Sequence, residues 1–145
     1  MTKCYLDSNV LIYLKDERSF GYQRSRKTIE KLVVQNISLY VSPLCLDEFL
    51  HGFGKALRSK TPEKEFFTNL ERALVSIFKF PQLFIINPPT NLETHAQIIS
   101  LMETYSLRPR DAYHLLTMQE NKINGFATCD KDFEKVFASK ILERA

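Results

Sequence analysis

Four short apolar runs, separated by long stretches with helical periodicity, constrain the fold of this chain most strongly. The runs are CYL (residues 4–6), ISLYVS (37–42), QLFIIN (82–87) and GFATCD (125–130). Runs of this length and composition are typical of strands, and helical segments between successive strands favour parallel pairing. We therefore expect an α/β fold with three layers, in which a central, mostly parallel sheet of four to five strands is flanked by helices.

The helical stretches have recognisable starts. We expect a first helix capped by Ser8 or Asn9, and another at 88–105 capped by Thr90 or Asn91. A late helix starts at LRPRDAYHLL (107–116), where proline suits the first helical position and an acid meets the positive end of the helix dipole. The remaining helices are predicted within 20–36, 44–59, 62–80 and 130–137.

Length and composition bound the organisation. With 145 residues, 44% of them hydrophobic, the chain is predicted to form one domain over residues 1–145. No apolar run has the roughly 20 residues of a membrane helix, and the N-terminus lacks the apolar stretch of a signal peptide. Cys4, Cys45 and Cys129 form no C-x-x-C pair and are interpreted as buried thiols. We expect a cytoplasmic protein.

Acidic residues recur at the predicted junctions between strands and helices. Asp7 and Asp130 end strands, with Asp132 close behind, Glu48 lies in the helix after the second strand, and Asp111 starts the late helix. Ligands of parallel sheets bind beyond the carboxyl ends of the strands. Hard cations such as Mg²⁺ take oxygen ligands and leave positions open for water or phosphate. The pattern favours a metal site that acts on phosphodiesters.

Each acid also has a simpler interpretation. Asp7, Asp111 and Asp130 could each stabilise a helix N-terminus by about 0.5 to 2 kcal/mol and do nothing else. Asp132 could be a solvated first-turn acid, and Asp47 competes with Glu48 as the residue that faces solvent. One acid alone does not decide between these interpretations; the set has to be considered together.

Four motifs in order resemble those of PIN-domain ribonucleases, and especially VapC-type toxins of toxin–antitoxin pairs. They are YLDSNVLIYL, SPLCLDEFL, LRPRDAYHLL and FATCDKDF, and the resemblance covers nearly the whole chain. It implies a PIN-like three-layer sandwich in which Asp7, Glu48, Asp111 and Asp130 hold Mg²⁺ or Mn²⁺. Asp132 falls where some members have an additional acid, and Asn9 and Thr128 match polar positions beside the metal.

The resemblance also implies a reaction and partners. It implies metal-dependent endonucleolytic cleavage of single-stranded or loop RNA, with 3′-hydroxyl and 5′-phosphate ends, by a homodimer that an antitoxin silences. Two residues depart from the family pattern: Ser8 stands where threonine is frequent, and His114 follows Asp111 on its helix. We expect neither side chain to touch the acids.

An RNA substrate requires positive charge around an acidic pocket. Setting the five acids aside leaves 12 of 17 acids against 20 Lys and Arg residues, so the remaining charge is about +8 instead of the overall +3. Arg108 and Arg110 beside Asp111 are the first candidates for phosphate contact. A second group is Arg24, Arg26 and Lys27, which could equally form a solvated helix face.

Several alternatives remain open from the sequence. Glu48-x-x-His51, loosely imitated by Asp111-x-x-His114, has the spacing of a di-iron helix bundle, although the predicted strands argue against one. The three histidines, His95 included, could be helix residues satisfied within the fold, and His114 could contact substrate. The chain could also be a housekeeping RNA-processing nuclease, or a PIN-like scaffold without catalysis.

An apolar stripe on one predicted helix suggests where a partner binds. Its members, at helical spacing, are Phe66, Phe67, Leu70, Leu74, Ile77 and Phe78. Such a stripe is typical of a core or of a subunit contact. Because so many phenylalanines exceed the needs of a small core, we expect the stripe to form a helical clip for the dimer or the antitoxin.

Overall fold

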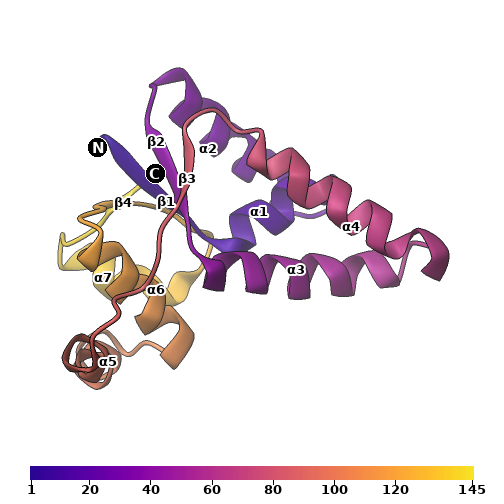
Figure 1. The fold of residues 1–145 in the computed structure, drawn as a ribbon. Coiled ribbons are helices and arrows are strands. Elements are labelled where there is room, and N and C mark those ends of the chain that lie inside the picture. Colours follow the sequence, from indigo (N-terminus) through magenta and orange to yellow (C-terminus); the bar gives the residue numbers. More distant parts are fainter.

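A five-stranded parallel sheet organises the computed structural model, which describes residues 1–145 (Figure 1). The strand order is β3-β2-β1-β4-β5, and every neighbouring pair is parallel. The elements are β1 (Lys3–Leu6), α1 (Ser8–Lys15), α2 (Tyr22–Val34), β2 (Ser38–Val41), α3 (Pro43–Arg58), α4 (Glu63–Phe78), β3 (Leu83–Ile85), α5 (Leu92–Tyr105), α6 (Pro109–Glu120), β4 (Gly125–Ala127), the 3₁₀ turn η1 (Lys131–Phe133), α7 (Glu134–Ala138) and β5 (Glu143–Arg144). The predicted α/β class with a mostly parallel sheet is confirmed.

Helices cover the sheet in two groups. Helices α1 to α4 gather on one side, where α3 and α4 run as a long pair that projects away from the sheet, and α5 to α7 lie on the other side (Figure 1). The central strand β1 is fully buried at Cys4, Tyr5 and Leu6 because it has a strand on either side and helices on both faces. No helix is both long enough and apolar enough to cross a membrane.

Local sequence explains where the helices next to the sheet edge begin. Helix α3 starts at Pro43, and the hydroxyl of Ser42 accepts the backbone N–H of Cys45 at 3.2 Å. Helix α6 starts at Pro109 and carries Asp111 in its first turn, as predicted. Asn91 caps α5 by accepting the N–H of Thr94 at 2.8 Å, which selects one of the two predicted caps.

Three local predictions need correction. Helix α1 is preceded by Asp7 at the cap position, and neither Ser8 nor Asn9 is the cap. The last predicted strand ends at Ala127, so Thr128 to Asp130 form a loop beyond it. Strand β5 was not predicted, because its two residues are exposed and polar and carry no apolar pattern.

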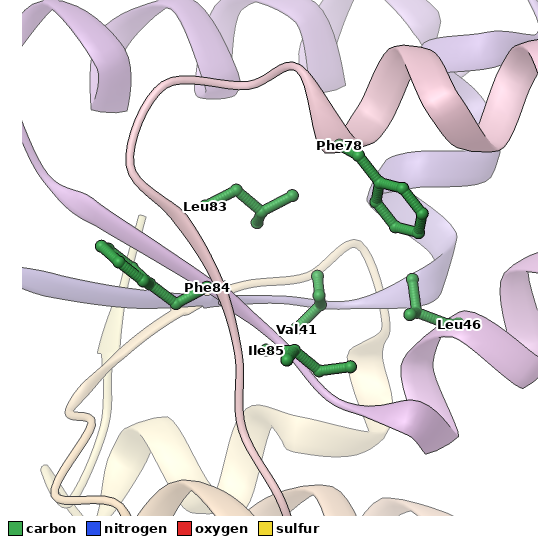
Figure 2. A pocket seen from close by; sticks show the side chains of 6 residues that line it. All are labelled: Val41, Leu46, Phe78, Leu83, Phe84 and Ile85. Carbon is green, nitrogen blue, oxygen red and sulfur yellow. The ribbon is translucent and has the colours of Figure 1, made fainter.

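The apolar stripe on α4 is divided by the fold. Phe66 and Ile77 are buried, whereas Phe67 is 73% exposed and Phe78 is 51% exposed. The two exposed rings line different hollows: Phe67 lies between α3 and α4, and Phe78 lies beside the edge strand β3 (Figure 2). The stripe therefore serves the core on one side and presents two separate apolar surfaces on the other.

Candidate active site

The carboxyl ends of the parallel strands bring the predicted acids to one edge of the sheet. Asp7 follows β1 directly, and its N–H bonds to the carbonyl of Ala127 at the end of β4 (3.0 Å). Glu48 reaches this edge from α3, which begins right after β2, and the loop beyond β4 brings Asp130. Parallel topology therefore gathers residues that are far apart in sequence.

Asp7 is held by a buried network. Its carboxylate is only 6% exposed and accepts hydrogen bonds from the Thr128 hydroxyl (2.5 Å) and the Asn9 amide (2.7 Å). The Asn9 carbonyl oxygen in turn accepts the N–H of Cys129 at 3.0 Å. Burial raises the pKa of Asp7, and the Thr128 hydrogen bond partly offsets that rise. The carboxylate is thus fixed in position at an electrostatic cost.

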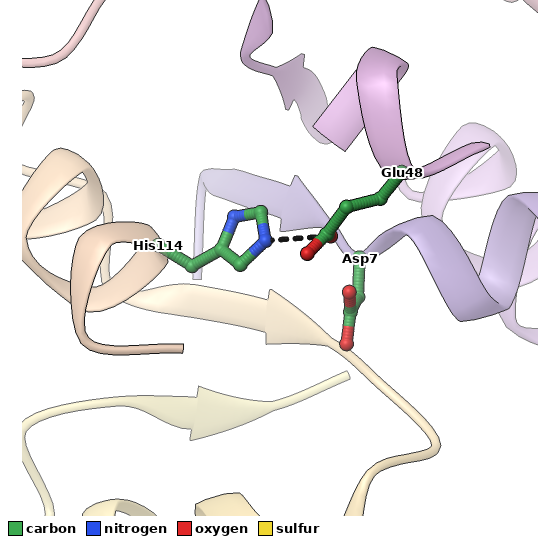
Figure 3. Close-up of side chains that lie close together, drawn as sticks. All are labelled: Asp7, Glu48 and His114. Carbon is green, nitrogen blue, oxygen red and sulfur yellow. Dashed lines mark hydrogen bonds and ion pairs between the residues drawn. The ribbon is translucent and has the colours of Figure 1, made fainter. Parts of the chain in front are cut away.

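Glu48 is held by the two residues that depart from the family pattern. Its Oε2 accepts the Ser8 hydroxyl at 3.1 Å. The same oxygen lies 2.9 Å from Nε2 of His114 (Figure 3). Burial alone would raise the pKa of Glu48, but the hydrogen bond and charge of His114, with help from Ser8, lower it overall. The expectation that Ser8 and His114 do not touch the acids is therefore wrong.

His114 links Glu48 to the core of the sheet. The other ring nitrogen, Nδ1, lies 2.8 Å from the hydroxyl of Tyr5 on β1, which lies 2.5 Å from the hydroxyl of Ser42 at the end of β2. His114, Tyr5 and Ser42 are all buried. Because both nitrogens have partners, the ring cannot turn without losing a hydrogen bond, and the imidazole holds Glu48 in one orientation.

The closest group of possible metal-binding side chains is Asp7, Glu48 and His114. One ligand atom from each lies within 4.8 Å of the others (Figure 3). The two carboxylates supply the hard oxygen donors that Mg²⁺ and Mn²⁺ prefer, whereas the nitrogens of His114 are already engaged by Glu48 and Tyr5. The donors present suit a divalent ion.

Asp111 and Asp130 line the cleft that opens from this group. The cleft has a volume of about 480 Å³ and is lined by Glu48, Arg108, Pro109, Arg110, Asp111 and Asp130. Partial burial raises the pKa of Asp111, and the charge of Asp130 raises it further. The cleft thus combines carboxylates with two arginines, a composition suited to a phosphate held near a cation.

The remaining predicted residues lie outside this core of the site. Asp132 is exposed and pairs with Arg108 at 3.2 Å. Arg24, Arg26 and Lys27 are exposed on α2, where Arg26 pairs with Glu30 at 2.7 Å. None of these four residues lines the cleft. Asp132 touches its rim only through the ion pair with Arg108.

The histidines and cysteines divide by their surroundings. His51 is exposed beside the hollow between α3 and α4. Glu48 instead contacts His114 of α6, so Glu48 and His51 do not form the di-iron pattern. His95 contacts the Tyr113 hydroxyl and the Pro89 carbonyl within the fold. Cys4 and Cys45 are buried as expected, whereas Cys129 beside Asp130 is only half-buried.

The family model of the PIN domain matches residues 4–137, and the chain belongs to this family. It is similar to "Ribonuclease VapC2" of Methanocaldococcus jannaschii, with 27% identity over 97% of this chain and 93% of the relative. The same fold occurs in VapBC2 from Rickettsia felis, solved with a DNA fragment from its promoter (TM-score 0.64, 18% identity, 99% and 97% covered). It also occurs in a toxin–antitoxin complex from Klebsiella pneumoniae (TM-score 0.63, 20% identity, 90% of both chains covered).

Proposed function

We propose that this chain, a single PIN domain over residues 1–145, is a divalent-metal-dependent endoribonuclease and the toxin of a type II toxin–antitoxin pair. The observation that carries the proposal is the meeting of carboxylates from four chain segments at one sheet edge, next to a cleft that two arginines line. The relative named as a ribonuclease and the neighbour solved as a toxin–antitoxin complex support it.

Four carboxylates hold the ion in this proposal: Asp7, Glu48, Asp111 and Asp130. Mg²⁺ is the expected ion, with Mn²⁺ as its substitute, because all four donors are carboxylate oxygens. When bound, such an ion lowers the pKa of a water for attack on phosphorus and neutralises charge on the leaving oxygen. Asp132 stays outside this set, since it is exposed and paired with Arg108.

Other residues position those carboxylates. Asn9 and Thr128 fix Asp7, and Ser8 and His114 fix Glu48, so both inner carboxylates keep their orientation before any ion binds. Preorganised ligands of this kind reduce the reorganisation that binding would otherwise require.

The arginines attract the substrate. Arg108 and Arg110 border the cleft, and the charge of Arg110 contributes to the lowered pKa of Glu48. We assign both arginines to the phosphate backbone of the RNA on either side of the cleavage point. Phosphate contacts give affinity that is independent of sequence and falls with salt.

The antitoxin and a second copy of the chain are the proposed protein partners. The exposed rings Phe67 and Phe78 are the candidate contacts, each in its own hollow along α4. Phe67→Glu and Phe78→Glu, made separately, should each disrupt whichever association uses that hollow. Light scattering measures the mass of the dimer, and titration with the protein encoded by an adjacent short reading frame measures antitoxin affinity. Unchanged mass and unchanged affinity in both variants would contradict this assignment.

The proposed cellular location is the cytoplasm. All three cysteines are free, which fits a reducing cytoplasm where such a toxin would meet its RNA.

Cleavage of mixed RNA by the purified protein tests the function. Cutting should occur with Mg²⁺ or Mn²⁺, stop with EDTA, and be lost in Asp7→Asn and Asp111→Asn. Metal-dependent cutting that survives both substitutions would contradict the site assignment. In a thermal scan, Mg²⁺ at about 100 times its Kd should stabilise the wild type by about 2.7 kcal/mol and leave Asp111→Asn nearly unchanged.

A further inference from the structure

An aromatic pair borders the acid site without taking part in holding the acids. Tyr13 lies in the last turn of α1, and Phe20 lies in the loop that follows. Their ring centroids are 5.0 Å apart with an interplanar angle of 57°, and Phe20 is 91% exposed. A phenylalanine this exposed gains little from the core, so its place on the surface needs another explanation.

Helical spacing places Tyr13 beside the segment that carries Asp130. Residues four apart share one face of a helix, so Tyr13 continues the face of Asn9, about 6 Å further along α1. Asn9 on that face bonds to Thr128 and to the N–H of Cys129. Partial burial raises the pKa of Tyr13, and the charges of Cys129, Asp130 and Asp7 raise it further, as expected of a ring close to the acids.

The loop after α1 is built to hold the pair in place. A Cβ atom on Gly21 would overlap the ring of Tyr13, so the ring occupies the space that any other residue at position 21 would need. The Ser19 hydroxyl donates to the Tyr13 carbonyl at 3.3 Å, and Lys60 of the α3–α4 connection binds Asp16 at 3.3 Å. These contacts hold the Tyr13 ring and the start of the loop in place.

We propose that Tyr13 and Phe20 form a stacking platform for an unpaired base of the RNA next to the phosphate that is cut. This inference rests on the proposed ribonuclease function and adds the residues that would hold an unpaired base of the substrate. Exposed aromatic rings stack on any nucleobase whose face is free, and a base inside a duplex has no free face. The exposed Arg24, four residues after Phe20 in the first turn of α2, supplies positive charge close by in the chain.

Phe20 is the residue to test, because a side chain that is 91% exposed can be changed without disturbing the core. Phe20→Ala should lower kcat/KM for single-stranded RNA by about tenfold to a hundredfold, the loss expected for one base–aromatic stack. Phe20→Trp should keep the rate, and the salt dependence of binding should not change in either variant because no charge is removed.

Leu92→Ala is the matched control. Leu92 is also a strongly exposed large apolar side chain (83%), but it lies at the start of α5 and lines neither the acid cleft nor the two hollows along α4. Its removal should leave RNA cleavage unchanged. If the wild type cleaves RNA and Phe20→Ala has the same kcat/KM, the proposed stacking platform is wrong and the ribonuclease function is unaffected.

A binding measurement separates the two proposals completely. Short single-stranded RNAs that contain the fluorescent base 2-aminopurine are titrated into Asp111→Asn, with and without Phe20→Ala. Fluorescence quenching that depends on Phe20 supports stacking, even if the wild type cuts no RNA and the nuclease proposal fails. Quenching that is absent, or equal in both proteins, overturns the platform. Loss of only a protein partner's binding would assign the pair to that partner and overturn it too.

Discussion

The two walls of the acid site differ in how firmly their carboxylates are held. Asp7 and Glu48, on the buried wall, each accept hydrogen bonds from side chains of other residues. Asp111 and Asp130, on the open wall, accept none from side chains, and Asp130 accepts only the backbone N–H of Asp132. The buried wall fixes geometry in advance, while the open wall leaves its oxygens free for an ion and its waters. Within one site, therefore, two carboxylates are held in fixed positions and two have oxygens without side-chain partners.

Asp7→Asn is the substitution expected to have the largest effect. It should reduce RNA cleavage by about a thousandfold, because the proposed metal site loses a carboxylate that would hold the charge-stabilising ion. The amide oxygen can still accept the hydrogen bonds of Asn9 and Thr128, so the fold should remain. Steady-state cleavage and a thermal scan measure both effects. Asp47→Asn, an exposed acid next to Glu48, is the control and should be neutral.

His114→Gln tests whether Glu48, on the buried wall, depends on His114 for its orientation. Loss of the imidazole should lower metal affinity or activity by about tenfold to a hundredfold, since Glu48 loses its orienting partner. The midpoint of a Mn²⁺ titration of activity is the measurement. His95→Gln removes a half-buried histidine that contacts Tyr113 away from the acids, and it should leave that midpoint in place. Equal midpoints for all three proteins would show that Glu48 needs no such partner.

The pH dependence of stability without metal should have opposite signs for the two carboxylates of the buried wall. The pKa of Asp7 is raised above 3.8 by burial, so the unfolded chain loses this proton first, and stability falls as the pH rises from 3.8 to the folded pKa. Glu48 has a lowered pKa despite its burial, because His114 favours its charged form. Its contribution is therefore present above 4.5 and is lost as the pH falls through the folded pKa.

Urea unfolding in EDTA across this pH range, on the wild type, Asp7→Asn and Glu48→Gln, measures both contributions. The wild-type curve minus the Asp7→Asn curve should show a free energy of unfolding that falls as the pH rises, and the wild-type curve minus the Glu48→Gln curve should show one that rises. Curves that stay parallel at every pH would mean that the two carboxylates do not differ in this way.

Asp132→Asn should have the smallest effect. The residue is exposed and its partner Arg108 has a side chain that is 80% exposed, so the ion pair should change stability by less than about 0.5 kcal/mol. Activity should stay within about twofold of the wild type. A loss above tenfold in a cleavage assay would instead make Asp132 a member of the open wall.

The sequence predicted the features that follow from strand topology. Once the strands and helices alternate, parallel pairing places residues after β1, β2 and β4 at one edge, and this is why Asp7, Glu48 and Asp130 could be expected there. The PIN resemblance, carried by the same motifs, is confirmed by the family match over residues 4–137. Both the fold and the location of the acids therefore depend on patterns that short segments carry.

The features that the sequence did not predict depend on contacts between distant segments. Glu48 and His114 are 66 residues apart, and no spacing rule relates a residue of α3 to one of α6. The Asp-x-x-His spacing of Asp111 and His114 was visible, but it was considered only as a loose imitation of a di-iron motif. Strand β5 forms because β4 offers a free edge, since Glu143 and Arg144 carry no strand pattern of their own.

The central place of β1 also has a consequence for the time at which the acid site can form during synthesis. Asp7 is made long before Thr128, whose hydroxyl fixes it and which lies 121 residues later, and Asp130 follows Thr128. A chain still on the ribosome has therefore emitted one carboxylate long before the others can join it. The acid site can therefore be completed only after β4 and the loop beyond it have been made.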